Sequence, residues 1–454
     1  MKTSRAGISA VLCMILTSSV WGAAAALAGD QGRVLDGPGA VLPHRDRAPA
    51  INRMLADRLE NVLPELMRET GIDCWLVINR EYAEDPVYLT MVPAPVFAAR
   101  RTTMLLFIDR GEEGVKRFTV NRYPLGELYE PAWEGGDLDE QWQRLGDLLA
   151  EYKPKTIGVN TSRHWPVADG LTQSLHARLL EVLTPELQER VTSAEELAIR
   201  WLETRTPAEL EVYPQIVSLA RGVIAESFSE RVITPGVTTT EDVSWYMWER
   251  FEELGLRIWF KPSVNTQHPD GECNTENPFC GVSDIIRPGD VIHTDVGICY
   301  LRLCTDTQEM GYVLRLGEDT VPDALVKALA DGNRWQDILT NEMVTGRTGN
   351  EILAAARSAS EAEGLNASIY THPLGFFGHA PGPTIGMWDN QGETPVRGDW
   401  PLYASTGYAI EGNVKVRRNG DDDWWQIKLE QSAVFDGEKV LYLAGRQTEW
   451  HVVR

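Results

Sequence analysis

The sequence predicts an α/β (α+β) protein made of two domains behind a leader segment. Helical periodicity alternates with short apolar strands over residues 51–203. Two long amphipathic helical segments follow, and after Gly255 short strands are separated by Gly- and Pro-rich loops. Alternating helices and strands are typical of a layered α/β domain. We therefore predict one domain over residues 51–203 and a second over residues 204–454, which suits a chain of 454 residues.

Residues 1–28 have the features of an export signal. Lys2 and Arg5 precede an apolar run over residues 10–20, and Ala26-Leu27-Ala28 is a small-x-small cleavage motif. We expect cleavage after this motif and a periplasmic or secreted protein. An uncleaved membrane anchor is the alternative, although the apolar run is short for a membrane-spanning helix.

The chain that remains after cleavage is acidic. The formal net charge of the whole sequence is −23, which argues against nucleic acid or an anionic membrane as the partner. No later segment is apolar over a length that would span a bilayer, so we expect no membrane association after cleavage. Residues 29–50 are rich in Gly, Pro and Arg, and we expect them to form an extended start of the mature chain.

Five cysteines follow the signal: Cys74, Cys273, Cys280, Cys299 and Cys304. Exported proteins can form disulfides, and the odd number leaves at least one free thiol. Cys299 and Cys304 flank a predicted hairpin turn, while Cys273 and Cys280 bracket a Pro-containing loop. For each pair the sequence leaves two interpretations open, a disulfide or two buried thiols.

The elements of the first domain can be assigned in order. Residues 51–80 predict a helix, a stop at Gly71 and a buried strand, and residues 102–111 predict a strand with a turn. Residues 142–165 predict a second helix and strand separated by a proline, and residues 175–183 predict a short helix. This order is that of an α/β layer.

The second domain opens with two helices. Thr206, Pro207 and Glu209 are typical of a helix start, and the first helical pattern runs to about residue 232. A turn at Pro235-Gly236 precedes the second helical pattern. Further helical patterns cover residues 323–339 and 349–365, and the last eighty residues consist of strands and loops.

Five potential metal ligands occur in the second domain. Asp295 and Asp306 lie 11 residues apart on a predicted β-hairpin, where inward side chains can face each other across paired strands. His379 follows in a Gly-rich segment, Glu411 ends a strand and Glu430 lies within another. Alone, each has an ordinary interpretation as a turn, surface or packing residue. Gathered in one buried pocket, four carboxylates and one imidazole would require cations, and two divalent ions would neutralise them.

This ordered set resembles the metallopeptidase family of methionine aminopeptidase, aminopeptidase P, prolidase and creatinase. The segment RTPAELEVYPQIVSLARGVIAESFSERVITPGVTTTEDV resembles the start of the catalytic domain in the aminopeptidase P, prolidase and creatinase branch. The resemblance implies a creatinase-like N-terminal α/β domain followed by a catalytic domain of the "pita-bread" fold. The overall layout is similar to Xaa-Pro aminopeptidase and prolidase.

The resemblance also implies roles for the ligands. Asp295 would chelate one ion, and Asp306 and Glu430 would bridge two ions. His379 and Glu411 would complete the shell of the second ion. Hard oxygen ligands with one imidazole suit Mn²⁺, Zn²⁺, Co²⁺ or Fe²⁺.

Catalytic roles follow from the same resemblance. Glu411 would accept a proton from the attacking water and pass it to the leaving amine. His268 and His372 are the candidates for histidines that contact the substrate. A further histidine expected after the ligand histidine is missing, and Trp388 occupies the matched place.

Three other residues stand near the ligands in the sequence. His293 precedes Asp295 by two residues and should share its strand face, which suggests a supporting role. Gln308 and Glu309 lie where relatives often have arginine after the second aspartate.

The sequence thus predicts an exported peptidase that uses two divalent metal ions to hydrolyse Xaa-Pro bonds. Its substrate would be a peptide with proline at the second position, either at the N-terminus of a longer chain or in a dipeptide. A homo-oligomer is compatible with the resemblance. Two alternatives remain open because of Trp388: a metal-dependent hydrolase of another amide or amidine, and a binding protein that has lost catalysis.

Overall fold

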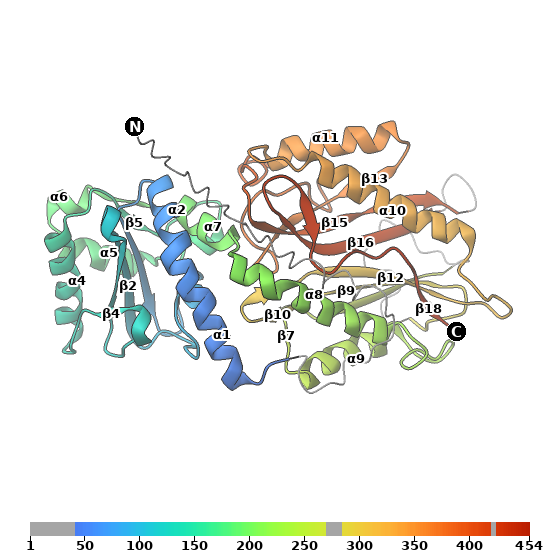
Figure 1. Cartoon of the computed structure of the whole chain (residues 1–454), viewed down its shortest axis with the longest axis horizontal. Coiled ribbons are helices and arrows are strands. Elements are labelled where there is room, and N and C mark those ends of the chain that lie inside the picture. The colour runs from blue at the N-terminus through green and yellow to red at the C-terminus, as the bar shows by residue number, and fades with distance from the viewer. Residues whose placement is uncertain (1–40, 269–283, 419–423) are drawn as a thin grey trace, which may run out of the picture.

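Two layered units lie side by side in the computed structural model, which describes residues 41–268, 284–418 and 424–454. The first unit is blue to teal in Figure 1, and the second is mainly yellow to red. The green helices α7 (Glu195–Glu203) and α8 (Pro207–Ser227) lie where the two units meet. The predicted mixed α/β class is confirmed.

The first unit is built on a six-stranded sheet of order β4-β3-β2-β1-β5-β6. Strand β1 lies inside this sheet, and six of its seven residues, CWLVIN, are buried. A strand covered on both faces is buried in this way. The strands are β1 (Cys74–Arg80), β2 (Thr102–Asp109), β3 (Val115–Val120), β4 (Glu130–Pro131), β5 (Ile157–Val159) and β6 (Val191–Ser193). The helices are α1 (His44–Asp57), the π-helical turn η2 (Arg58–Val62), α2 (Leu63–Glu69), α3 (Tyr88–Met91), α4 (Leu138–Tyr152), α5 (Gln173–Val182) and α6 (Pro185–Gln188).

Part of the segment expected to be extended is helical. Residues 44–50 form the first half of α1, whereas residues 29–40 lie outside the described residues. Pro43 occupies the N-cap position and Asp46 lies in the first turn, where a negative charge favours a helix. Pro49 is accommodated inside the helix. The prediction of an extended conformation is wrong for residues 44–50. The Gly and Pro residues that suggested it lie mainly before residue 44.

The second unit contains a nine-stranded sheet with the main order β13-β15-β16-β12-β9-β8. Three further strands pair beside this path: β14 with β15, β17 with β16 and β18 with β12. The strands are β8 (Ser263–Gln267), β9 (Val291–Val296), β12 (Thr307–Val313), β13 (Asn366–Ile369), β14 (His372–Leu374), β15 (Thr406–Arg417), β16 (Trp424–Phe435), β17 (Val440–Tyr442) and β18 (His451–Val453).

Four long helices accompany this sheet: α8, α9 (Thr240–Glu253), α10 (Asp323–Glu342) and α11 (Gly349–Ala362). The predicted start of α8 is confirmed, because Thr206 and Glu209 form a reciprocal capping box. Gly332 of α10 lies directly against the side chains of Leu429 and Ile427 on β16. Residues alternate between the two faces of a strand, so Lys428 and Glu430 point to the face opposite α10.

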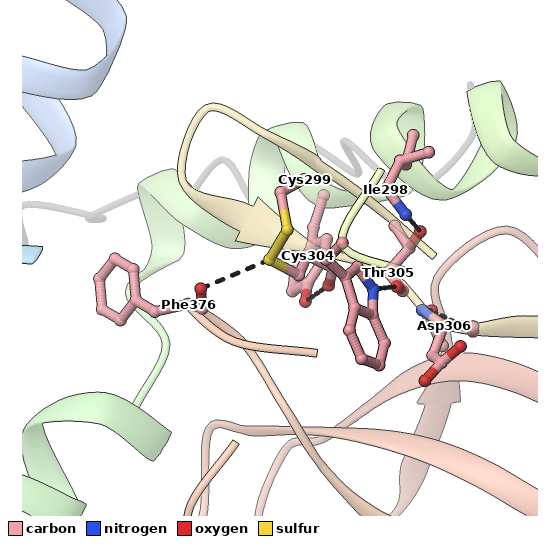
Figure 2. Close-up of a disulfide and its surroundings, with 9 residues drawn as sticks. Ile298, Cys299, Cys304, Thr305, Asp306 and Phe376 are labelled. Carbon is pink, nitrogen blue, oxygen red and sulfur yellow. Dashed lines mark hydrogen bonds between the residues drawn. A yellow bond between two sulfur atoms is a disulfide. The ribbon is translucent and has the colours of Figure 1, made fainter. Parts of the chain in front are cut away.

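The segments around the two aspartates pair as antiparallel strands, but Asp295 lies opposite Gln308, and Asp306 lies just before β12. Strands β9 and β12 are antiparallel, and the residues between them form β10 (Ile298–Tyr300) and β11 (Leu303–Cys304). These short strands and β7 (Arg257–Ile258) make a separate three-stranded sheet. Cys299 and Cys304 are directly opposite each other and are joined by a disulfide (Figure 2).

Cys74 is a buried free thiol, and Cys273 and Cys280 lie outside the described residues. Within the described ranges no helix combines the length and apolarity needed to cross a membrane.

Candidate metal centre

Four strands of the large sheet align a row of polar side chains. Asp295 on β9 is directly opposite Gln308 on β12, and Gln308 is opposite Glu430 on β16. Glu430 is in turn opposite Glu411 on β15. Directly paired residues share one face of a sheet, so three carboxylates and one amide point into the same space. Residues up to 135 positions apart in the chain (295 to 430) are therefore neighbours.

Asp306 and His372 extend this row. Asp306 is two residues before Gln308, and Ser432 fixes its backbone by donating a hydrogen bond to its carbonyl oxygen at 2.9 Å. His372 lies on β14 opposite Ala409, two residues from Glu411. Its Nε2 atom is 3.6 Å from Asp306 Oδ2, 3.6 Å from Glu430 Oε1 and 3.7 Å from Glu411 Oε2. The imidazole thus stands among three carboxylates.

The pKa values of the cluster reflect burial and crowding. Burial raises the pKa of Asp295 to about 6 and that of Glu411 to about 8. For Asp306 and Glu430, burial and then the neighbouring carboxylates raise the pKa well above the ordinary value. Burial alone would lower the pKa of His372, but Glu430 and Glu411 outweigh it and raise the value to about 9. Without a cation the site therefore retains protons near neutral pH.

The donor atoms of the cluster fit divalent metal ions. Five buried atoms have no hydrogen-bond partner among the described residues: Asp295 Oδ1, Asp306 Oδ1, His372 Nε2, Glu430 Oε1 and Glu430 Oε2. Unpaired buried polar atoms are costly unless they meet a ligand.

The ligand atoms also group into sets of the size that a metal ion needs. Asp295, Asp306 and Glu430 offer atoms within 4.8 Å of one another, and so do His372, Glu411 and Glu430. Glu430 belongs to both sets, which is the arrangement expected of a carboxylate between two ions.

His379, the predicted imidazole ligand, lies beside His372. Its side chain is exposed at the edge of the cluster, and its ring centroid is 4.7 Å from that of His372. Together with Asp306 and His372 it forms a third possible ligand set, but His372 is the imidazole that reaches three carboxylates. The geometry therefore favours His372 over His379 as the imidazole ligand. No local sequence pattern indicates which histidine lies among the carboxylates.

Trp388 is not needed to account for a missing histidine under this assignment. With His372 as the ligand, His379 lies seven residues further on and supplies the second histidine. Trp388 itself is 68% exposed and lies in the turn between the paired residues Met387 and Asn390. With His379 as the ligand, as the sequence predicted, Trp388 would still occupy the place of the second histidine.

The structure places His268, a predicted substrate contact, away from the row of carboxylates. His268 follows β8 at the end far from Ser263, which is the residue that pairs with Asp295. Its Nδ1 atom is 2.7 Å from Asp290 Oδ1, and its Nε2 atom contacts Asp284. Both ring nitrogens are thus engaged in an Asp–His–Asp arrangement that connects the chain on either side of the segment 269–283. The spacing along the chain does not show at which end of β8 His268 lies relative to Asp295.

Glu309 and Gln308 face opposite sides of β12. Glu309 is 1% exposed, and it pairs with Arg221 at 2.5 Å and with His451 at 2.5 Å. These ion pairs connect β12 with α8 and β18, so Glu309 supports the fold rather than the cluster. Gln308 belongs to the polar row described above.

Two residues near the cluster were missed by the sequence reasoning. Lys428 shares a face with Glu430 and is close enough to Asp295 and Glu411 for each carboxylate to raise its pKa, although burial lowers that pKa overall. Trp259 packs edge-on against His379, with ring centroids 5.1 Å apart, and leaves no space for a side chain at Gly297 or Gly378. The alternation of residues along β16 could have placed Lys428 beside Glu430.

The disulfide lies close to Asp306, because Cys304 precedes it by two residues (Figure 2). The backbone N–H of Cys304 donates to Gly375 O at 2.8 Å, and Cys304 Sγ is 3.4 Å from Phe376 O. The indole N–H of Trp259 donates to Thr305 O at 2.9 Å. Hydrogen bonds therefore connect the segment between His372 and His379 to the residues that precede Asp306.

The fold and the cluster together define an α/β protein with a candidate metal-binding catalytic centre. Residues 215–415 match the sequence model of metallopeptidase family M24. This stretch of the chain is therefore similar to an M24 metallopeptidase domain, in agreement with the resemblance inferred from the motifs. A search of curated proteins by sequence found no match.

Solved structures of low sequence identity share the fold. X-Pro aminopeptidase from Thermotoga maritima MSB8 has a TM-score of 0.61 and 18% identity, over 86% of this chain and 100% of that one. Xaa-Pro dipeptidase from Bacillus anthracis has a TM-score of 0.57 and 16% identity, over 91% and 100%. Prolidase from Pyrococcus furiosus has a TM-score of 0.52 and 13% identity, over 85% and 98%. Both units of this chain thus have counterparts in the matched structures.

Proposed function

We propose that this protein is an exported peptidase that holds two divalent metal ions and hydrolyses Xaa-Pro bonds. The observation that carries the proposal is the convergence of Asp295, Asp306, His372, Glu411 and Glu430, with five unpaired buried ligand atoms among them. Divalent ions in such a centre polarise a carbonyl group and lower the pKa of water. Mn²⁺, Zn²⁺, Co²⁺ and Fe²⁺ all suit this set of donors.

The ligands divide naturally between two ions. Asp295, Asp306 and Glu430 would hold one, and His372, Glu411 and Glu430 would hold the other. The carboxylates contribute a charge of −4, which two divalent cations balance. Lys428 adds one positive charge beside Asp295 and Glu411, so the loaded centre can also accommodate an anionic nucleophile.

Two residues at the centre have catalytic roles in this proposal. Glu411 accepts a proton from the attacking water and delivers it to the leaving amine. The His379 side chain lies at the exposed edge of the cluster, with its ring centroid 4.7 Å from that of His372. One of its ring nitrogens would donate a hydrogen bond to the substrate carbonyl.

The Xaa-Pro specificity rests on the names of the structural neighbours. X-Pro aminopeptidase, Xaa-Pro dipeptidase and prolidase all occur among them at identities of 13–18%. We propose that the substrate is a peptide with proline at its second position. Export is supported by the signal-like residues 1–28 and is compatible with the Cys299–Cys304 disulfide.

Hydrolysis assays with and without metal test this function. The purified protein is treated with EDTA and then reloaded with Mn²⁺, Zn²⁺, Co²⁺ or Fe²⁺, using a dipeptide Xaa-Pro and a longer peptide Xaa-Pro-Xaa as substrates. We expect hydrolysis to disappear with EDTA and to return with metal, and we expect substrates with alanine in place of proline to be cut slowly. Full activity of the metal-free protein, or equal rates on the alanine substrates, would contradict the corresponding part of the proposal.

A further inference from the structure

A buried glutamine occupies the middle of the carboxylate row. Gln308 is 4% exposed and stands between Asp295 and Glu430 in the register of the sheet. Its amide Nε2 donates a hydrogen bond to Glu411 Oε1 at 2.5 Å. A neutral side chain at this position adds no charge to four crowded carboxylates, and its N–H group meets one of them directly.

The other end of the Gln308 amide is also held. His293 is 4% exposed, and its Nε2 atom is 2.8 Å from Gln308 Oε1. Because this nitrogen faces an amide oxygen, which can only accept, Nε2 carries a proton and donates it to Gln308 Oε1. Its Nδ1 atom has no hydrogen-bond partner among the described residues.

The orientation of each group in this chain follows from its neighbour. The amide presents its N–H to Glu411 and its oxygen to His293, and this orientation suits Glu411 as a metal ligand, because a ligating carboxylate is ionised and can only accept. His293 donates to that oxygen and opposes a flip of the amide. Glu411 Oε1 is thereby occupied, while Oε2 remains 3.7 Å from His372 Nε2.

We infer that Gln308 is a positioning residue for the metal centre, with His293 setting its orientation. The inference rests on the proposed function, because it assigns a purpose to Gln308 only if Glu411 is a ligand. Gln308 selects which oxygen of Glu411 is free to meet the ion shared with His372 and Glu430. Groups that orient ligands in this way typically change metal affinity by about 10–100-fold.

The test measures metal binding rather than catalysis. Gln308→Leu keeps the approximate volume and removes the donor, and His293→Phe keeps a ring and removes the donor to Gln308. Each full-length variant is stripped of metal and titrated with Co²⁺ against a competing chelator, with the absorption spectrum recorded at each step. We expect Gln308→Leu to weaken one of the two binding steps by about 10–100-fold and to shift the spectrum of that ion. His293→Phe should change the same step by a smaller factor.

A matched control separates ligand orientation from loss of a buried amide. Gln141 in the first unit is also 4% exposed and donates hydrogen bonds to Thr102 O and Val120 O. Gln141→Leu should lower the melting temperature and leave both Co²⁺ binding steps unchanged. In Gln308→Asn the side chain is one methylene shorter, so its amide cannot reach Glu411. This variant should not restore the wild-type Co²⁺ affinity.

The outcomes distinguish this inference from the proposed function. If wild-type protein binds no Co²⁺, the proposed function fails. If wild type binds two ions and Gln308→Leu binds both with unchanged affinity and spectrum, the inference about Gln308 is wrong. Equal weakening of both steps in Gln308→Leu would also overturn it, because only the ion that shares Glu411 should respond.

Discussion

Replacing Asp295 with asparagine should stabilise the protein when metal is absent. Burial raises the pKa of Asp295 to about 6, against 3.8 in an unfolded chain. Between these two values the folded protein binds more protons than the unfolded chain, so stability falls as the pH rises through that window. The difference of about 2 pKa units corresponds to about 3 kcal/mol at pH 7, where the folded state must hold an ionised buried carboxylate.

Asparagine removes this cost because its side chain does not ionise. For a unit of this size about 3 kcal/mol corresponds to a change of roughly 6–12 °C in melting temperature. Metal-free Asp295→Asn should therefore melt above metal-free wild type at pH 7, and the gap should close near pH 4. His372 has the same sign of dependence, since its pKa of about 9 means that stability is lost as the pH rises from 6.5 through 9.

Differential scanning calorimetry at pH 4, 5.5 and 7, after EDTA treatment, measures the effect. Reloading with Mn²⁺ or Zn²⁺ should reverse the order of the two proteins, because only wild type retains the full ligand set and gains stability from binding. The reasoning would be refuted if metal-free Asp295→Asn melted below wild type at pH 7. It would also be refuted if the gap were the same at pH 4 and pH 7.

Three further predictions concern other parts of the structure. His372→Ala should lower the metal content measured by mass spectrometry from two ions to one or none, whereas His379→Ala should keep both ions and raise KM or lower kcat; the reverse pattern would restore His379 as the ligand. Glu309→Gln removes the charge of a buried ion-pair network, and we expect a loss of about 3–5 kcal/mol in urea unfolding at neutral pH. Burial would raise the pKa of Glu309, but its pairing with Arg221 and His451 outweighs this and lowers the value to about 2. The stabilisation by ionised Glu309 is therefore present above pH 4.5 and is lost as the pH falls through 2. The difference in unfolding free energy between Glu309→Gln and wild type should shrink in acid. Reducing the Cys299–Cys304 disulfide, which spans five positions, should cost about 2 kcal/mol by the chain-entropy relation, and an unchanged melting temperature in reductant would contradict this.

Local sequence patterns were enough to predict the class of fold. The apolar run at Cys74–Arg80 could only be a buried strand, and Thr206 with Glu209 marked the start of α8 through hydrogen bonds made within one helical turn. Such features depend on residues that are close in the sequence, so they can be predicted without a structure. The helix at residues 44–50 was missed because its N-terminal signals were obscured by the Gly and Pro content of the residues before it.

The sequence by itself determined which chemical groups this protein has: four carboxylates in order along the second domain, with imidazoles among them. Tertiary structure alone decided which groups meet. Strand register placed Asp295, Gln308, Glu430 and Glu411 in one row, and the pairing of β14 with β15 brought His372 to the carboxylates while leaving His379 at the edge. The pairing of β8 with β9 places Ser263 opposite Asp295, and His268 follows the other end of β8. The physical reason is that a one-residue change in register reverses the face on which a side chain lies, and register depends on contacts between segments far apart in the chain.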